Sequence, residues 1–435
     1  MEAARARRPR ILGPGWPLVV LFAAYPLWWL LGFGAFVWPV VAVPVAVSLV
    51  ARRNLKVPVG AGIWFLFLGW VLLSATQLET GGLAFVFRLA LYLSATVVLL
   101  YVYGGRRDHR FDEFAGRILV GFWVAVVAGG FVGLLLPNLS FRSLAEYLLP
   151  QSVLADEFVY ELVHPQFAQT MDFLGYPVPR PSALFTYTNE WGSAFALLTP
   201  LAIWGLPWLR ARLGHGARLL IAASFIPVLV SLNRGLWITL AAGLLYAMVR
   251  LAGSSARRAA GRVLAVVAVI VALVALTPLR GLVIDRIETG HSNNTRGDLY
   301  GEAYERTLDS PLLGYGGPLP SERRPNAPRV GTQGQLWMVL FSHGFPGAAL
   351  FVGFFAYAFA RTWRPRTVLG FWCHVTLLIG LLQLPVYGLL PVQIHILMVA
   401  AALGLRASTG PARPPLASLP PERVTTTPHL EALSR

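Results

Sequence analysis

The chain has 435 residues, of which 56% are hydrophobic and only 13% are charged. Soluble domains carry about 25% charged residues, so this composition excludes an ordinary soluble domain. The formal net charge is +16, and the placement of the basic residues decides whether it indicates a nucleic-acid-binding or a membrane protein.

Apolar runs of about twenty residues recur along most of the chain, and each can form a helix that crosses a hydrocarbon core of about 30 Å. The sequence therefore predicts an all-α polytopic membrane protein with about 12 transmembrane helices. The predicted spans are 14–32, 35–51, 59–77, 83–103, 116–137, 186–208, 218–232, 235–250, 261–279, 334–360, 367–382 and 387–405.

Basic residues gather in alternate connections, in segments such as "RARRPR", "ARRNLK" and "GGRRDHR". The positive-inside rule then places both termini in the cytoplasm. Topology and anionic lipid explain these clusters, so nucleic acid is not expected as a partner. A large extracytoplasmic loop is predicted between helices 9 and 10.

The domain organisation follows from this layout. Residues 1–406 are predicted to form a single transmembrane domain that includes two long extracytoplasmic loops, at about 138–185 and 280–333. Long loops often carry function, and the first is partly amphipathic, which favours an interfacial helix. Residues 407–435 are rich in Pro, Ser and Thr and predict a disordered cytoplasmic tail.

Metal sites and disulfides are not expected. No two of the histidines have metal-ligand spacing on one helix, so the sequence predicts no metal site, and no cofactor is expected. The single cysteine, Cys373, lies in an apolar run and is interpreted as a small core residue.

The segment "LLIAASFIPVLVSLNRGLWITLAAGLLYAMV" places Arg234 in the middle of apolar sequence. Arg218 and Arg250 are predicted to be cytoplasmic, so the segment must cross outward and return. Each arm of about 15 residues spans roughly 23 Å, short of a full bilayer core. Arg234 is therefore expected below the outer surface, either as an arginine that snorkels from a hairpin tip or as a cation that lines an outward-facing cavity.

Another outward segment, "VPRPSALFTYTNEWGSAFALLTP", places Arg180, Asn189 and Glu190 at the start of the sixth span, which could begin with a broken or re-entrant turn. Asn189 could cap this helix or contact a ligand. Glu190 is an unusual residue at a membrane boundary.

A third segment, "NTRGDLYGEAYERTLDSPLLGYGG", contains Arg296, Asp298, Glu302, Glu305 and Arg306. Apart from Arg296, their helical spacing favours ordinary surface ion pairs. "DSPLLGYGG" predicts a turn that ends the helix.

Several arginines in a cavity open to the outside would suit a lipid-linked phosphate or diphosphate. The planar guanidinium matches phosphate oxygens and remains charged. Fixed cations also stabilise the negative charge that a diphosphate leaving group gains.

The three segments, in this order, resemble the O-antigen ligase and O-antigen polymerase superfamily over about 178–360. "RPSALFTYTNEWGSA" is similar to the family stretch Arg-x-x-Gly-Leu-Phe-x-x-Pro-Asn, with Ala183 and Thr188 replacing Gly and Pro. "SLNRGLW" is similar to Ser-x-Ser-Arg-Gly-x-Trp, and "NTRGDLYGEAYERTLDSPLLGYG" is similar to the stretch that runs from an arginine to Pro-Leu-x-Gly-x-Gly.

The resemblance implies a bacterial plasma-membrane glycosyltransferase. Such an enzyme takes a glycan from an undecaprenyl-diphosphate carrier on the outer face and passes it to a glycan, lipid or protein acceptor. By matching position, Arg180, Arg234 and Arg296 would hold the diphosphate. Asn189, Asn233 and Asp298 are secondary candidates.

One departure concerns the general base. Counting back from "SHGFPG" places Gln333 where the family usually has a histidine, and glutamine cannot act as a base. Glu190 is the candidate substitute, while His343 is interpreted as a packing or inter-helix hydrogen-bonding residue. A transporter or flippase for a lipid-linked or anionic substrate remains the alternative function, and a membrane scaffold without catalysis is a third.

Overall fold

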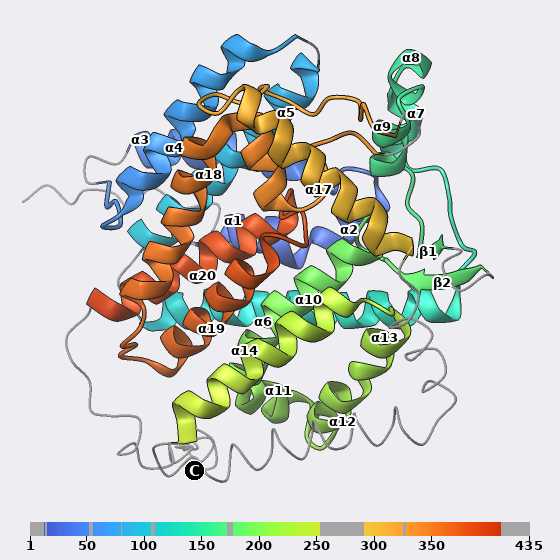
Figure 1. Ribbon diagram of the computed structural model, residues 1–435. Helices are drawn as coiled ribbons and strands as arrows, with labels where there is room; N and C mark the ends of the chain where they lie inside the picture. Colours follow the sequence, from blue (N-terminus) through green and yellow to red (C-terminus); the bar gives the residue numbers. More distant parts are fainter. Residues whose placement is uncertain are drawn as a thin grey trace, which may run out of the picture.

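The computed structural model describes residues 13, 15–51, 55–79, 81–105, 109–171, 177–252, 291–324 and 328–409. Figure 1 shows a bundle of helices with one small sheet at its edge. Within the described residues, this sheet is two-stranded and the rest of the regular structure is helical. The prediction of a mostly helical chain is therefore confirmed.

The helices and strands follow in chain order. They are α1 (Trp16–Leu18), the π-helix η1 (Val19–Ala23), α2 (Tyr25–Leu30), α3 (Val37–Val50), α4 (Ala61–Ser74), the 3₁₀ turn η2 (Ala75–Gln77), α5 (Gly82–Gly104), α6 (His109–Leu135), α7 (Leu144–Leu148), α8 (Gln151–Leu154), α9 (Glu157–Val163), β1 (Ala168–Met171), β2 (Val178–Pro181), α10 (Thr188–Trp204), α11 (Leu206–Leu213), α12 (Gly216–Ala223), α13 (Phe225–Val230), α14 (Arg234–Ala252), α17 (His291–Asp309), α18 (Gln335–Arg361), α19 (Val368–Gln383) and α20 (Val392–Thr409).

Length and apolar composition identify candidate membrane spans among the described residues. Five helices are long and apolar enough to cross a bilayer: Gly82–Gly104, His109–Leu135, Arg234–Leu251, Gln335–Arg361 and Val392–Thr409. A sixth results if α10 and α11 form one span, which is bent by 76°. These helices support a multi-pass membrane protein. The predicted span 261–279 lies outside the described residues, and the count of 12 stays a prediction.

The first predicted span is broken into α1, η1 and α2. Pro17 and Pro26 stand in the first turns of α1 and α2, where the missing N–H of proline costs no helical hydrogen bond. The second predicted span forms α3, which contains Pro44. A broken or re-entrant turn was expected at the start of the sixth span, but the bend lies at Gly205, at the opposite end of α10.

Helix α20 lies at the centre of the bundle, where it packs against α5, α10, α18 and α19. It is buried almost throughout, as expected for a helix that is apolar on all sides. Its buried His395 contacts the Ser94 hydroxyl of α5 through Nε2 at 2.8 Å and stacks on Trp38 at 4.2 Å. These contacts satisfy a polar group inside the core.

The small sheet is antiparallel, with Gln169 opposite Arg180. It lies against α6 at Gly133, where a Cβ atom would come within 2.4 Å of the Phe167 carbonyl oxygen. The close approach requires glycine, and it fixes the position of the sheet, with Arg180 on β2, just before α10 begins.

The two long connections lie on one side of the bundle. Figure 1 shows α17 and α7 to α9 along one edge, and α11, α12 and the end of α14 along the opposite edge. The α11–α12 segment carries Arg210, Arg212 and Arg218. The loop sides expected from charge stay a prediction. Helix α20 runs to Thr409, and the rest of the predicted tail lies outside the described residues.

Candidate functional site

Tyr387 lies in the connection between α19 and α20 and is only 2% exposed. Its hydroxyl donates a hydrogen bond to Asn233 Oδ1. Its carbonyl oxygen accepts a hydrogen bond from the Gln335 N–H at 2.7 Å, at the first residue of α18. Tyr387 therefore joins the starts of α14 and α18.

Arg180 approaches the same place from β2. Its side chain is 3% exposed. The Nε atom donates to the Ser231 carbonyl oxygen at 2.5 Å, and Nη1 contacts Met171 Sδ at 3.0 Å. This guanidinium is thus buried against the turn that precedes α14.

Two arginines act on the Tyr387 hydroxyl electrostatically. Burial raises the pKa of Tyr387 above its ordinary value, while the positive charges of Arg296 and Arg180 oppose that shift. The hydroxyl therefore stays neutral and remains a hydrogen-bond donor. Arg296 on α17 and Arg180 on β2 are far apart in sequence, yet both act on one buried group.

Arg234 is the first residue of α14 and is half-buried. It follows Asn233, whose Oδ1 also accepts from the Leu236 N–H at 3.3 Å. Asn233 Nδ2 is buried and has no hydrogen-bond partner among the described residues. The turn contains a further unusual feature, since Leu232 has a φ of 49°. A bulky residue in the left-handed region is strained, and such strain gathers at functional sites.

Gly235 allows Tyr387 to approach α14. A Cβ atom at this position would lie 2.5 Å from the Tyr387 hydroxyl oxygen. The Arg-Gly pair of "SLNRGLW" therefore has a steric reason: the residue after Arg234 must be small for the tyrosine to reach Asn233.

Gln333 and Gln335 differ in their surroundings. Gln335 is fully buried; its Nε2 donates to the Tyr92 hydroxyl at 3.0 Å, and its Oε1 accepts from the Leu389 N–H at 2.9 Å. Gln333 is half-buried, and its side chain makes no hydrogen bond to another described residue. Gln335 therefore holds the site together, while the Gln333 amide has unused hydrogen-bonding capacity.

Glu190 has a different neighbourhood from the arginines. Its Oε2 accepts from the Thr186 N–H at 3.2 Å. Together with Glu161 it raises the pKa of Tyr187, for which burial is the main cause, and the Tyr187 hydroxyl donates to Glu161. Glu190 thus lies in an acidic region next to the start of α10.

Asn189 does not cap α10. The helix begins at Thr188, its N-cap residue is Tyr187, and no side chain caps it. Asn189 is half-buried and makes no side-chain hydrogen bond to another described residue. The capping interpretation is therefore wrong, because the helix starts at Thr188, two residues too early for Asn189 to be its N-cap residue.

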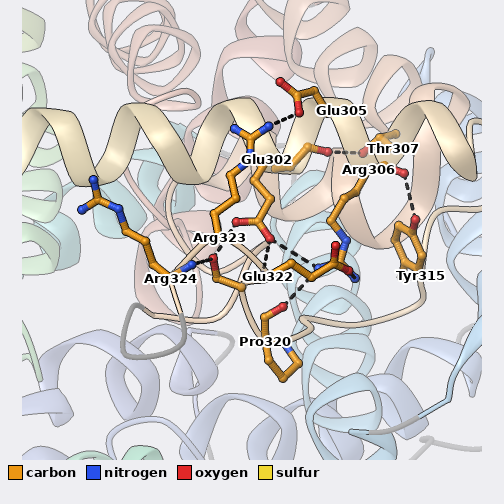
Figure 2. A network of polar contacts seen from close by, with 11 residues as sticks. Glu302, Glu305, Arg306, Thr307, Tyr315, Pro320, Glu322, Arg323 and Arg324 are labelled. Atoms are coloured by element: carbon orange, nitrogen blue, oxygen red, sulfur yellow. Dashed lines mark hydrogen bonds and ion pairs between the residues drawn. The ribbon is translucent and has the colours of Figure 1, made fainter.

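Helix α17 is anchored by a polar network, shown in Figure 2. Glu302 is 3% exposed, accepts from the Ser321 hydroxyl at 2.6 Å and from the Glu322 N–H at 2.8 Å, and lies 3.5 Å from Arg306. Burial raises the pKa of Glu302, but these partners more than offset it, so the pKa is below its ordinary value. The expectation of surface pairs is wrong for Glu302, because the segment after the helix folds back over it.

Other acidic residues of α17 are exposed and paired as expected for surface residues. Asp298 pairs with Arg324, and Glu305 pairs with Arg323. The partners come from the returning segment rather than from the next turn of the helix. Asp298 is thus used in a structural ion pair, and it holds the part of α17 that carries Arg296.

The "DSPLLGYGG" turn ends α17 at Asp309, as predicted. Gly314 has a φ of 63°, and a Cβ atom there would lie 2.4 Å from the Phe341 carbonyl oxygen. His343 is buried, and its Nδ1 contacts the Ser74 hydroxyl of α4 at 2.6 Å. The interpretation of His343 as an inter-helix hydrogen-bonding residue is confirmed.

Tyr387 and Gln335 did not emerge from the sequence as site residues. A signal was present, because Tyr387 is a polar-tipped residue in the turn "LPVYGLLP" at the predicted outer end of two spans. Nothing local, however, indicates that this turn meets Asn233 and the start of α18.

Residues 219–352 match a family model described as O-Antigen ligase. This match confirms the resemblance to the O-antigen ligase and polymerase superfamily and supports glycan transfer in general. The matched segment contains Arg234, Arg296 and Gln333, whereas Arg180, Glu190 and Tyr387 lie outside it. No curated protein matches the chain.

Proposed function

We propose, from the O-antigen ligase match of residues 219–352, that this protein is a membrane glycosyltransferase, either a ligase or a polymerase. It transfers a glycan from an undecaprenyl-diphosphate-type carrier to an acceptor hydroxyl. Arg180, Arg234 and Arg296 hold the diphosphate without a metal ion. The acceptor is a glycan, a lipid or a protein.

The observation that carries this proposal is the contact of Tyr387 with Asn233, next to Arg234, together with the action of two arginine charges on the same hydroxyl. Arg180 and Arg296 both act on its hydroxyl, and the hydrogen-bond acceptor of that hydroxyl, Asn233, immediately precedes Arg234. Guanidinium groups at such a place match the oxygens of a diphosphate. A cation as well buried as Arg180 is costly unless a negative group or dense hydrogen bonding offsets it.

The reaction needs one bond to form and one to break. The acceptor oxygen attacks the anomeric carbon, and the bond from that carbon to the diphosphate oxygen breaks. The carrier leaves as the diphosphate with the bonding electrons, and the acceptor proton passes to a base or to solvent. Arginines stabilise the charge that develops on the leaving group.

Proton removal falls to a group other than Gln333, because an amide is not a base. Gln333 can hydrogen-bond the acceptor or donor through its unused amide. Glu190 is the proposed base, in the first turn of α10, where the Thr188 hydroxyl donates to the Arg180 carbonyl oxygen. In this mechanism the acceptor enters beside Glu190 while the diphosphate stays with the arginines.

The proposed location is the bacterial plasma membrane, with the site facing the extracytoplasmic side. Support comes from the long apolar helices and from the position of α17 opposite the arginine-bearing α11–α12 segment (Figure 1). One observation favours the alternative, a transporter or flippase. Helices α10 and α11 meet at a 76° bend, and broken helices are common in transporters.

Reconstituted protein tests the proposal directly. Proteoliposomes that contain an undecaprenyl-diphosphate-linked oligosaccharide and an acceptor glycan should release free carrier diphosphate and form a longer glycan. Arg180→Ala and Arg234→Ala should each lower the transfer rate by about 10²-fold, the usual effect of removing a charge-stabilising group. Chelation of divalent metals should leave the rate unchanged.

Arg212→Ala is the matched control, because Arg212 lies on α11 and stacks on Trp208. It should retain full activity. Normal transfer by folded Arg234→Ala would contradict the assigned role of that arginine. Movement of the lipid-linked glycan across the bilayer with no new glycosidic bond would favour the transporter instead.

A further inference from the structure

A polar hollow lies at the start of α10, beside β1. Its walls come from α2, the segment around α9 and β1, and the residues just before α10. The lining side chains that matter here are Trp29, Glu161, His164, Gln166, Gln169 and Tyr187. None of the residues that have a role in the proposed transfer reaction lines this hollow.

The hollow has unused hydrogen-bonding capacity among the described residues. The Gln166 side chain is exposed and makes no hydrogen bond to them. His164 uses Nδ1 to contact Glu146 at 2.8 Å, which leaves Nε2. Gln169 uses Oε1 to accept from the Thr188 N–H at 3.3 Å, which leaves its amide donors. The walls therefore offer both donors and acceptors, as hydroxyl groups require.

The charge of the hollow is negative. Glu161 lines it, and Glu157 and Glu190 act on the Tyr187 hydroxyl together with Glu161. No arginine or lysine is among the lining residues in the described part of the chain. A phosphate or a carboxylate would be repelled here. The indole ring of Trp29 adds a flat apolar surface, as in pockets that combine aromatic rings with a few polar groups.

The hollow and the arginine group share structural elements. Gln169 pairs with Arg180 across the β1–β2 ladder. Thr188 links both, since its N–H donates to Gln169 Oε1 and its hydroxyl donates to the Arg180 carbonyl oxygen, each at 3.3 Å. A substrate with its diphosphate at Arg180 thus has the hollow as its next polar neighbour.

We propose that this hollow is a subsite for an uncharged, hydroxyl-rich sugar unit. The inference rests on the proposed glycan transfer, and it names the part of the substrate that binds outside the arginine group. The sugar belongs either to the donor chain beyond its first residue or to the acceptor. Glu190, at the edge of this subsite, then lies beside a sugar hydroxyl.

Site-directed labelling tests the subsite without requiring transfer. The chain has a single cysteine, Cys373, which is buried, so an introduced cysteine is the accessible one. The maleimide labelling of Gln166→Cys should slow about fivefold in short neutral hexose or N-acetylhexosamine chains, because occupancy covers the thiol. Polyuronic acid and inorganic pyrophosphate should not protect it.

Thr170→Cys is the matched control. Thr170 follows Gln169 on β1 and is exposed on the other face of the strand. Its labelling should be unchanged in every sugar. Equal protection of both cysteines, protection of Gln166→Cys by pyrophosphate, or no protection by any neutral chain would overturn the subsite.

Kinetics distinguish the two sources of the sugar. Glu161→Gln removes the negative charge of the acceptor and Tyr187→Phe removes the hydroxyl donor of the Glu161–Tyr187 hydrogen bond, and each should raise one KM about tenfold. A rise in the acceptor KM identifies the acceptor, and a rise in the donor KM identifies the donor chain. If both KM values stay unchanged while wild type transfers glycan, the subsite is wrong and the transferase stands. If neutral sugars protect Gln166→Cys but wild type makes no product, the transferase is wrong and the subsite stands.

Discussion

Replacing Tyr387 with phenylalanine removes the hydroxyl that donates to Asn233 Oδ1 and on which the charges of Arg180 and Arg296 act. The ring remains, so the packing around it is kept. Asn233 Oδ1 loses the tyrosine donor but keeps the Leu236 N–H at 3.3 Å. Because one of two bonds to the amide oxygen survives, the expected loss is about 1–2 kcal/mol in unfolding free energy.

Tyr387→Phe should also weaken donor binding. The tyrosine is the donor that holds Asn233, and Asn233 precedes Arg234 in the strained turn. Without it the start of α14 is less constrained, and we expect the donor KM to rise about tenfold, equivalent to about 1.4 kcal/mol. Initial rates at varied donor concentration, with thermal unfolding measured in parallel, provide both numbers.

Tyr246→Phe is the matched control for this substitution. The Tyr246 hydroxyl contacts His374 Nε2 at 2.7 Å and accepts from Arg250 Nη1 at 2.8 Å, near the far end of α14. Its loss should lower stability by a similar amount and leave the donor KM unchanged. The reasoning is refuted if Tyr387→Phe leaves the donor KM at the wild-type value, or if both variants raise it equally.

Three further substitutions probe the site and its frame. Gly235→Ala should lower the unfolding free energy by about 1–3 kcal/mol through overpacking and raise the donor KM, because its Cβ would lie 2.5 Å from the Tyr387 hydroxyl oxygen. If this contact is the cause, the same substitution should lower the unfolding free energy less in the Tyr387→Phe background. Glu302→Gln should lower the thermal midpoint near neutral pH, because Glu302 with its depressed pKa contributes stability as the anion; unfolding scans should show the difference from wild type shrinking as the pH falls below about 4.5, the ordinary glutamate value. Arg406→Met should lower the unfolding free energy by about 3 kcal/mol without changing the donor KM, because Arg406 Nη1 donates to three backbone carbonyl oxygens near the end of α5; denaturant unfolding and donor kinetics measure the two effects.

Several features of the chain were predictable from local pattern. Apolar runs located the helices, because a membrane-spanning helix must be continuously apolar and its boundaries are marked by charge and by Pro or Gly. The turn after α17 followed from "DSPLLGYGG", and Cys373 is buried as expected. The three arginine-bearing segments were also recognisable in order, and the family match covers two of those arginines.

The sequence was a poorer guide wherever a side chain is satisfied by a distant partner. Glu302 has helical spacing typical of a surface pair, yet the returning segment buries it. Asn189 is a good capping residue by type, but α10 begins at Thr188 and leaves it inside the first turn. Neither outcome follows from periodicity, because each depends on where a separate stretch of chain lies.

The sequence by itself determined the class of the protein, since burying so many apolar residues in helices within a bilayer is dictated by composition and by backbone hydrogen bonding. It also placed arginines in three segments that are far apart in the chain. Only the tertiary structure decided that Arg180 and Arg296 act on the same tyrosine, and that Glu190 acts with Glu161 on Tyr187, which lines a polar hollow. The physical reason is that electrostatic and hydrogen-bonding partners depend on distances between segments that are far apart in the chain. Local sequence determines only which face of a helix is apolar and which is polar.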